Sequence, residues 1–311
     1  MAGGSNAGDS WNDPDKVVNR LKRAAQQAIT AEVSAKLAEI LNSALADANN
    51  RDIDLVGSRI DEVTSALGDV VEAPIKTLFG GSVAKHTYVD GLSDIDTLLV
   101  LDGTEFENKR PSDAIKILTD LIENAVPGAN AKGGKLAVTI TYGDGMEIQM
   151  LPAFQQGDRL RVPKFSSDEW SDISPLKFQN KLTDVNQACG GKVVPTIKLA
   201  KAIMGGLPET QRLSGYHTES LAIEVFKKYD GTKTPAAMLP HFFEQASKLV
   251  LSPIKDSTGQ SVHVDDRLGS EDSKPRRMQS HVLNRLYKRL RNAAAHGQTA
   301  IWDSMLSSFD D

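Results

Sequence analysis

The sequence has little cysteine, no long apolar run and no excess of positive charge, and each shortage excludes a class of protein. Cys189 is the only cysteine among 311 residues, so no intramolecular disulfide can form and a reducing compartment is expected. No run of about 18 apolar residues occurs, so no membrane-spanning helix is expected. The first residues, Met-Ala-Gly-Gly-Ser-Asn, lack a basic start and an apolar core, which predicts no secretory signal. We therefore expect a cytoplasmic protein.

The charge balance limits the partners. The net charge is −5, from 36 lysines and arginines against 41 aspartates and glutamates. A large, permanent nucleic-acid surface should be basic, so this balance argues against one. Two local basic clusters remain, and a solvated helix face is the simpler explanation of the second. The first comprises Lys192, Lys198 and Lys201, and the second comprises Arg276, Arg277, Arg285, Lys288, Arg289 and Arg291.

Apolar periodicity divides the chain into a mixed first half and a helical second half. Steps of three and four residues predict helices over about 15–48 and 53–67, and Ser112 is a plausible N-cap for a helix over 112–126. A hairpin is expected from strands at 136–142 and 146–151, joined by a Gly-Asp-Gly turn and closed by Pro152. An edge strand is expected at 160–162. From Pro175 onward helices dominate, with a break at Cys189-Gly-Gly and a polar loop or lid over 253–275.

One segment of the first half carries the clearest chemical signal. Asp94 and Asp96 stand at i and i+2, just before the apolar run Thr97-Leu-Leu-Val-Leu101. Side chains alternate along a strand, so both carboxylates point to one face. They would repel each other without a cation between them, and hard oxygen ligands suit Mg²⁺. Taken alone, such a pair is more often a solvated strand end.

Two further features favour a site. Upstream, the glycines before Ser82 let the backbone approach a ligand closely, and Ser82 offers a hydroxyl at the start of a turn. Downstream, Glu147 begins a strand whose face it could share with the two aspartates. Three carboxylates on one sheet face can hold two metal ions, which position the attacking and leaving oxygens in nucleotidyl transfer.

These motifs resemble those of the polymerase-β-like nucleotidyltransferases, and more narrowly the bacterial cGAS/DncV-like nucleotidyltransferases (CD-NTases), relatives of the oligoadenylate synthetases. The resemblance spans about residues 75–260. It rests on Gly81-Ser82 with Thr87, Ser93-Asp-Ile-Asp96, Glu147-Ile-Gln-Met-Leu-Pro152, Ile197-Lys-Leu-Ala-Lys201, Tyr216-His-Thr-Glu-Ser-Leu221 and Leu251-Ser-Pro-Ile-Lys-Asp-Ser-Thr-Gly259.

The chain departs from the family pattern at two positions. Gly215 stands directly before Tyr216, where the family usually has serine, and Ser214 is one residue further back. The third carboxylate of the family often lies closer to the proline, where this chain has Gln149. Glu147, two residues earlier, is the substitute that we expect.

The resemblance implies an α/β (α+β) fold with a mixed-sheet nucleotidyltransferase lobe, a C-terminal helical lobe and an active site in the cleft between them. We expect a loose N-terminus over 1–13, a catalytic lobe with the N-terminal helices over 14–172, and a helical nucleotide-binding lobe over 173–311. Asp94, Asp96 and Glu147 would bind two Mg²⁺ ions, which Mn²⁺ can replace.

The resemblance also implies a nucleotide site. Its expected residues are Gly81, Ser82, Thr87, Lys198, Lys201, Ser214 and Tyr216. Lys201 would contact the triphosphate, although the spacing of Lys198 and Lys201 is explained equally well by a solvated helix face. Tyr216 could stack on a base, although a tyrosine at a helix start more often packs. His86 and His217 are expected at the surface or behind the metal ligands.

The implied activity is template-independent synthesis of a cyclic di- or trinucleotide from ATP, alone or with other nucleoside triphosphates, as a second messenger in anti-phage defence. A separate effector would respond to the product, and a regulatory partner protein could restrain the enzyme. Three alternatives remain: a linear oligoadenylate synthase, a tRNA-end or small-molecule adenylyltransferase, and a non-catalytic nucleotide-binding module. The acidic charge argues against the tRNA enzyme, and the three carboxylates argue against the binding module.

Overall fold

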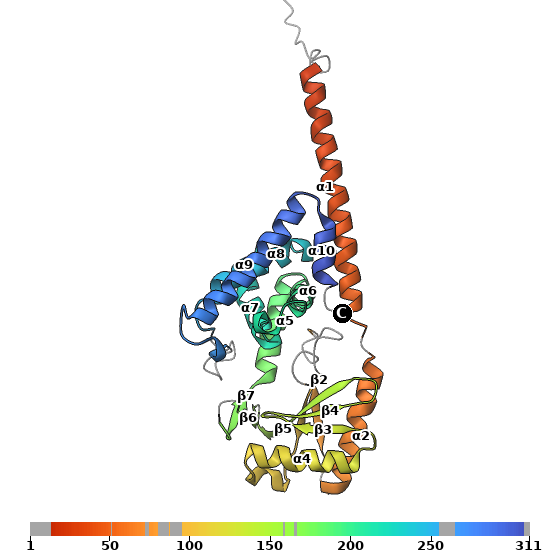
Figure 1. The fold of residues 1–311 in the computed structure, drawn as a ribbon, viewed down its shortest axis with the longest axis vertical. Helices are drawn as coiled ribbons and strands as arrows, with labels where there is room; N and C mark the ends of the chain where they lie inside the picture. The colour runs from red at the N-terminus through yellow and green to blue at the C-terminus, as the bar shows by residue number, and fades with distance from the viewer. Residues whose placement is uncertain are drawn as a thin grey trace, which may run out of the picture.

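The chain forms a strand-rich part and a helical part that lie end to end, with the first helix running past the helical part (Figure 1). The computed structural model describes residues 14–50, 52–71, 75–79, 87, 95–157, 159–164, 167–254 and 265–307. The α-helices are α1 (Pro14–Asp47), α2 (Ile53–Val71), α4 (Pro111–Ala125), α5 (Pro175–Ala188), α6 (Val193–Gly205), α7 (Gly215–Phe226), α8 (Pro235–Leu249), α9 (Lys274–Ala295) and α10 (Thr299–Leu306). The strands are β1 (Lys76–Phe79), β2 (Ile95–Val100), β3 (Asn130–Gly133), β4 (Val138–Thr141), β5 (Glu147–Gln156), β6 (Arg159–Pro163) and β7 (Trp170–Ile173).

The strands form one mixed sheet. Its order is β1-β2-β5-β4-β3, and β6 pairs with the far end of β5 and with β7. β2 and β5 run parallel, from the pair Ile95↔Ile148 to the pair Val100↔Ala153. The other pairs are antiparallel. The mixed sheet and the following helices confirm the α/β (α+β) class expected from the sequence.

Helices α2 and α4 cover one face of the sheet. Their apolar stripes bury Ile60 and Leu118 against Leu99, Ile148 and Met150 of the central strands. Leu98 alternates with Leu99 along β2 and points to the opposite face, where it packs with Leu160 and Val162 of β6. The face that carries Leu98 is therefore also the face of Asp96, two residues earlier.

The helical part has its own core. Helices α5 to α10 bury large side chains such as Phe226, Phe242, Phe243 and Trp302, together with most of α6. Gly190 and Gly191 both have positive φ, 64° and 76°, and they end α5 before α6 starts. This is the break expected at Cys189-Gly-Gly. Pro195 lies in the first turn of α6, where its missing N–H costs little.

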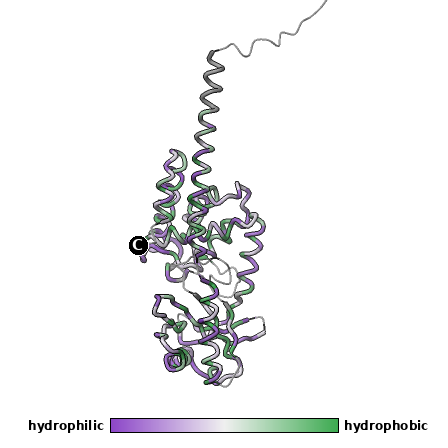
Figure 2. The backbone as a smooth tube through the Cα atoms, turned by 90° about the vertical axis from the view of Figure 1, so that its right-hand side faces the viewer, coloured by the Kyte–Doolittle hydropathy of each residue, from purple (hydrophilic) through white to green (hydrophobic). Residues whose placement is uncertain are grey.

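Helix α1 packs with the helical part and not with the sheet. Leu37, Ile40, Leu41 and Ala44 join the helical core, whereas α2 joins the sheet. The described side chains from Ala25 to Glu32 are exposed, and Figure 2 shows from a second side that this part of α1 runs beyond the other helices and the strands. The N-terminal helices were expected to belong to the catalytic lobe over 14–172, but α1 packs with the helical core. An apolar stripe predicts a buried face but not which core buries it.

The helices and the hairpin predicted from the sequence are confirmed, whereas three details of the strands and caps differ. Helices α1, α2 and α4 and the β4–β5 hairpin are confirmed within a few residues. Ser112 is not the N-cap of α4, because the helix starts at Pro111 and Ser112 donates its N–H and hydroxyl to Asp168 at 2.9 and 2.8 Å. Pro152 does not end β5, which continues to Gln156. Pairing with β4 stops at Val138↔Met150, before Pro152, so the missing N–H of this proline breaks no hydrogen bond to β4. Strand β6 is not an edge strand, because β7 pairs with it.

Candidate active site

The register of β2 and β5 fixes the first part of the site. Asp96 is the parallel partner of Gln149, so both positions lie on the face opposite α2 and α4. Glu147 lies two residues before Gln149 on the same face, is exposed, and accepts a hydrogen bond from Thr141 Oγ1 at 3.2 Å. Glu147 comes just before the first parallel pair, Ile95↔Ile148. It therefore lies near the start of β2, which directly follows Asp94 in the sequence. The expectation that Glu147 shares a face with Asp96 is consistent with this register.

Part of the expected metal and phosphate site lies outside the described residues. Gly81, Ser82, His86 and Asp94 fall there, and of Asp96 only the backbone is described. In the ranges that are described, no three histidine, cysteine, aspartate or glutamate side chains converge as a metal site would require. The arrangement of the three expected metal ligands therefore stays a prediction.

A buried cluster joins the segment between β1 and β2 to the helical part. Lys201 Nζ in α6 donates to Glu219 Oε1 in α7 at 2.7 Å and to the Thr87 carbonyl oxygen at 2.9 Å. Thr87 Oγ1 donates to the same Glu219 oxygen. Lys201 is 6% exposed, Glu219 1% and Thr87 0%. The structure thus brings together two residues expected at the nucleotide site, Thr87 and Lys201.

Lys198 has a different partner. Its side chain is also buried, and its ammonium donates to Asn49 Oδ1 in the connection between α1 and α2. Asn49 in turn donates its amide to the Leu45 carbonyl oxygen at 2.6 Å. Both lysines are therefore internal, and the solvated helix face that their spacing alone allowed is wrong.

The start of α7 lies directly beside Lys201. Ser214 is the N-cap, and its hydroxyl accepts the His217 N–H at 3.2 Å. A Cβ on Gly215 would lie 3.3 Å from Lys201 Nζ, so a serine here would crowd the ammonium. Tyr216 is 38% exposed and packs against Phe178 with ring centroids 4.9 Å apart.

His217 is fully buried, which corrects the surface placement that the sequence allowed. Its Nε2 lies 3.6 Å from Asp265 Oδ2. Burial lowers the pKa of His217 to about 4, against the opposing effect of Asp265. Asp265 is also the partner of Arg276, whose guanidinium contacts it at 2.5 Å and is itself 0% exposed. Arg276 therefore does not belong to a solvated basic face, although Arg277, Arg285, Lys288, Arg289 and Arg291 are exposed.

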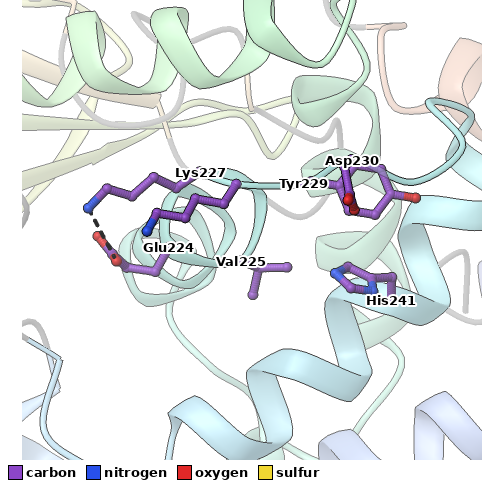
Figure 3. Close-up of a pocket in the computed structure, with 7 residues that line it drawn as sticks. Glu224, Val225, Lys227, Tyr229, Asp230 and His241 are labelled. Carbon is purple, nitrogen blue, oxygen red and sulfur yellow. Dashed lines mark ion pairs between the residues drawn. The ribbon is translucent and has the colours of Figure 1, made fainter.

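A separate hollow of about 340 Å³ lies at the far end of α7. Figure 3 shows Lys227 paired with Glu224 on one side and Tyr229 facing His241 on the other. None of the expected site residues lines this hollow. Its lining is a neutralised ion pair beside aromatic rings, so we do not assign it to the active site.

The sequence analysis missed Glu219 and Asn49 as site residues. Glu219 had a signal: α7 buries most of its residues, and an acidic side chain in such a helix requires a partner. Asn49 had none, because an asparagine after a helix is ordinary in any sequence.

Comparisons with known proteins agree with this architecture. The family model "Second Messenger Oligonucleotide or Dinucleotide Synthetase domain" matches residues 32–186. No curated protein matches the sequence. Among solved structures, Escherichia coli MS115-1 CdnC with ATP has a TM-score of 0.63 at 16% identity, over 88% of this chain and 98% of that chain.

Two further structures show the same fold. The Bradyrhizobium diazoefficiens CD-NTase CdnG in complex with GTP has a TM-score of 0.62 at 14% identity, over 89% of this chain and 98% of that chain. The Escherichia coli MS115-1 CdnC:HORMA-deltaN complex has a TM-score of 0.58 at 16% identity, over 89% of this chain and 94% of that chain. In the part of the chain that is described, no helix is both long and apolar enough to cross a membrane.

Proposed function

We propose that this chain, which belongs to the bacterial cGAS/DncV-like nucleotidyltransferases, makes a cyclic di- or trinucleotide from nucleoside triphosphates. ATP is one substrate, alone or with a second triphosphate. In each step the 2′- or 3′-hydroxyl of one nucleotide attacks the α-phosphorus of another, and pyrophosphate leaves. The last step closes the ring on the remaining 5′-triphosphate. Structures of CdnC with ATP and CdnG with GTP support triphosphate substrates.

One observation carries this proposal above the others: the parallel register that places Asp96 beside Gln149. It puts the Asp96 position and exposed Glu147 on one sheet face, opposite the packed face of α2 and α4. A carboxylate-bearing face that α2 and α4 leave uncovered is what nucleotidyl transfer requires.

The expected cofactor is a pair of Mg²⁺ ions held by Asp94, Asp96 and Glu147, with Mn²⁺ as a substitute. Glu147 fits this role, since it is an exposed carboxylate on the face of Asp96 and Mg²⁺ prefers such oxygen ligands. When bound, the ions would orient the attacking hydroxyl and the leaving pyrophosphate and neutralise their charge.

The triphosphate would lie between Gly81-Ser82 and the helical part. Ser82 would donate its hydroxyl to a phosphate oxygen, and the Lys201 ammonium would stabilise the charge that develops on pyrophosphate. Thr87 would fix the segment that carries Ser82, Lys198 would support α6 beside Lys201, and Ser214 would fix the start of α7. Tyr216, exposed beside Phe178, would stack on a base.

The overall charge favours free nucleotides over a template. A tRNA acceptor or a template strand needs a basic track, and the chain carries a net charge of −5. Without a template, a second nucleotide must supply the acceptor hydroxyl in the same cleft. Linear oligoadenylate synthesis and other nucleotidyl transfer remain the alternative activities.

The cyclic product would act in the cytoplasm on a separate effector during anti-phage defence. Such an enzyme must be restrained until infection, and a regulatory protein is one means of restraint. CdnC, which shares the fold, is found in a complex with HORMA-deltaN, so a protein partner of this kind is a reasonable expectation here.

The test is incubation of the pure protein with labelled ATP, GTP, CTP and UTP and Mg²⁺, followed by phosphatase treatment and chromatography. A cyclic product lacks a terminal phosphate and survives the phosphatase unchanged. A folded Asp94→Ala, Asp96→Ala double variant should make none, and omission of Mg²⁺ and Mn²⁺ should stop the reaction. Exclusively linear products would favour the oligoadenylate alternative, and strict dependence on added tRNA would reject the signalling role.

A further inference from the structure

Thr87, Lys201 and Glu219 form a buried polar cluster. The three residues lie on different segments: the connection between β1 and β2, helix α6 and helix α7. Thr87 is 114 residues from Lys201, which is 18 residues from Glu219. All three side chains are at most 6% exposed. Each is linked to both others by a hydrogen bond or ion pair.

Such a cluster is costly to build unless its charges compensate each other. A buried ammonium or carboxylate loses its hydration, and an ion pair regains this cost only with good geometry and further hydrogen bonds. Glu219 supplies the ion pair and a further hydrogen bond, because one of its oxygens accepts from the Lys201 ammonium and from the Thr87 hydroxyl. Glu219 is thus the counter-charge that the described contacts give the Lys201 ammonium.

We infer that Glu219 is a positioning residue, which holds Lys201 and the Thr87 segment in one fixed relation. Thr87 lies between Ser82 and Asp94 in the sequence, so the cluster anchors the middle of the segment that carries both. Lys201 is held at the first turn of α7, where the Gly215 Cβ position is 3.3 Å from its ammonium. Glu219 thereby fixes Thr87 relative to α6 and α7 of the helical part.

This inference rests on the proposed function, because it assigns Lys201 and Ser82 to one triphosphate. It adds a consequence that a purely structural ion pair would not have. Loss of the Glu219 charge should weaken triphosphate binding through Lys201 and Ser82. It should also slow turnover through Asp94, even when the nucleotide is saturating.

The test compares Glu219→Gln, which keeps the shape and removes the charge, with wild type. Inorganic tripolyphosphate is the binding probe, measured by calorimetry, and steady-state incorporation of labelled ATP gives KM and kcat. We expect the dissociation constant of tripolyphosphate to rise roughly tenfold or more, as for loss of a charge-assisted hydrogen bond. We also expect kcat to fall by a similar factor, and Thr87→Val to reproduce part of both effects while Thr87→Ser does not.

Trp302→Phe is the matched control. Trp302 is buried in the same helical core and donates to the Leu290 carbonyl oxygen at 3.1 Å, so its replacement lowers stability away from Lys201. Trp302→Phe should leave tripolyphosphate binding and kcat unchanged even where it lowers Tm as much as Glu219→Gln does. Equal losses in both variants, or wild-type binding and turnover in folded Glu219→Gln, would overturn the inference. If Glu219→Gln does not fold, the Thr87→Val and Thr87→Ser pair decides in the same way.

The outcome also separates the two proposals. A wild-type protein that makes no oligonucleotide, yet binds tripolyphosphate in a Glu219-dependent manner, would reject the proposed function and keep the positioning role. If oligonucleotide synthesis is unchanged in the Glu219→Gln and Thr87→Val variants, the proposed function would stand and the positioning role would be rejected.

Discussion

Asp96 and Gln149 are direct neighbours across the parallel ladder of β2 and β5, and Glu147 lies two residues earlier on the same face. Two residues of a strand span about 7 Å. Within β5, whose sequence EIQMLPAFQQ contains no other acidic residue, Glu147 is the carboxylate available to the proposed metal site. The proposed third ligand is therefore shifted away from Asp96 and toward the start of the strand.

The first prediction concerns this shifted carboxylate. Glu147→Gln should lower kcat by roughly a hundredfold or more, because charge that develops in the transition state loses part of its stabilisation. Folding should be unaffected, since the side chain is exposed. Incorporation of labelled ATP and a thermal unfolding curve measure the two effects.

A second substitution shows whether Glu147 itself or only this sheet face is required. Gln149→Glu in the Glu147→Gln background restores a carboxylate beside Asp96, at the position more usual in the family. Partial recovery of kcat would support a metal ligand on this face. A Glu147→Gln variant with wild-type activity would remove Glu147 from the site.

The second prediction concerns Gly215. Gly215→Ala adds a methyl group 3.3 Å from Lys201 Nζ and 3.4 Å from its Cε, which should displace the ammonium by a few tenths of an ångström. We expect the apparent KM for ATP to rise severalfold, measured at limiting ATP. Gly57→Ala is the control, because nothing lies within 4 Å of a Cβ there. Within α2 it should raise stability by about 1 kcal/mol and leave KM unchanged.

Much of the fold could be predicted from the sequence because its signals are local. The Gly143-Asp-Gly145 turn between alternating apolar residues predicted the β4–β5 hairpin, and the apolar steps of α1 predicted a long helix. The partner of α1 could not be predicted, since its stripe from Leu37 to Ala44 would suit either core. Strand β3 was missed because Asn130–Gly133 contains one buried side chain and no apolar alternation.

For the site, residue type and strand spacing predict Asp94, Asp96 and Glu147 as metal ligands, and this assignment stays a prediction. The burial of Arg276 could not be predicted, because it lies in a basic stretch that suggests a solvent-facing helix. Lys201 lies in the apolar sequence of α6, where the spacing of Lys198 and Lys201 left a solvated face possible. The counter-charges of Lys201 and Arg276 come from neighbouring but separate segments: Glu219 lies 18 residues from Lys201, and Asp265 lies 11 residues from Arg276. Pairing of that kind depends on tertiary packing.

The third prediction concerns the pH dependence of stability. The folded pKa of His217 is lowered by burial from 6.5 to about 4, so between these values the unfolded chain binds more protons. Stability should therefore rise with pH across this window and be lost as the pH falls through it. The His217 contribution is at most about 3 kcal/mol.

Urea unfolding at several pH values tests this. His217→Gln cannot titrate, so its free energy of unfolding should vary less between pH 4 and 6.5 than that of wild type. The same replacement at exposed His296 serves as the control. A pH slope that is unchanged in His217→Gln would show that other groups dominate in this window.

The last prediction concerns Tyr216. Its ring is 38% exposed and rests on Phe178 with centroids 4.9 Å apart, which leaves a rigid aromatic surface at the start of α7, beside Lys201. Stacking of a base on such a ring contributes about 1–3 kcal/mol. Tyr216→Ala should therefore raise the KM of one nucleotide substrate roughly tenfold, whereas Tyr216→Phe keeps the ring and should behave like wild type. Initial rates with each nucleoside triphosphate varied in turn would identify the base that stacks. If Tyr216→Ala leaves every KM unchanged while Tm falls, the ring serves only to pack against Phe178.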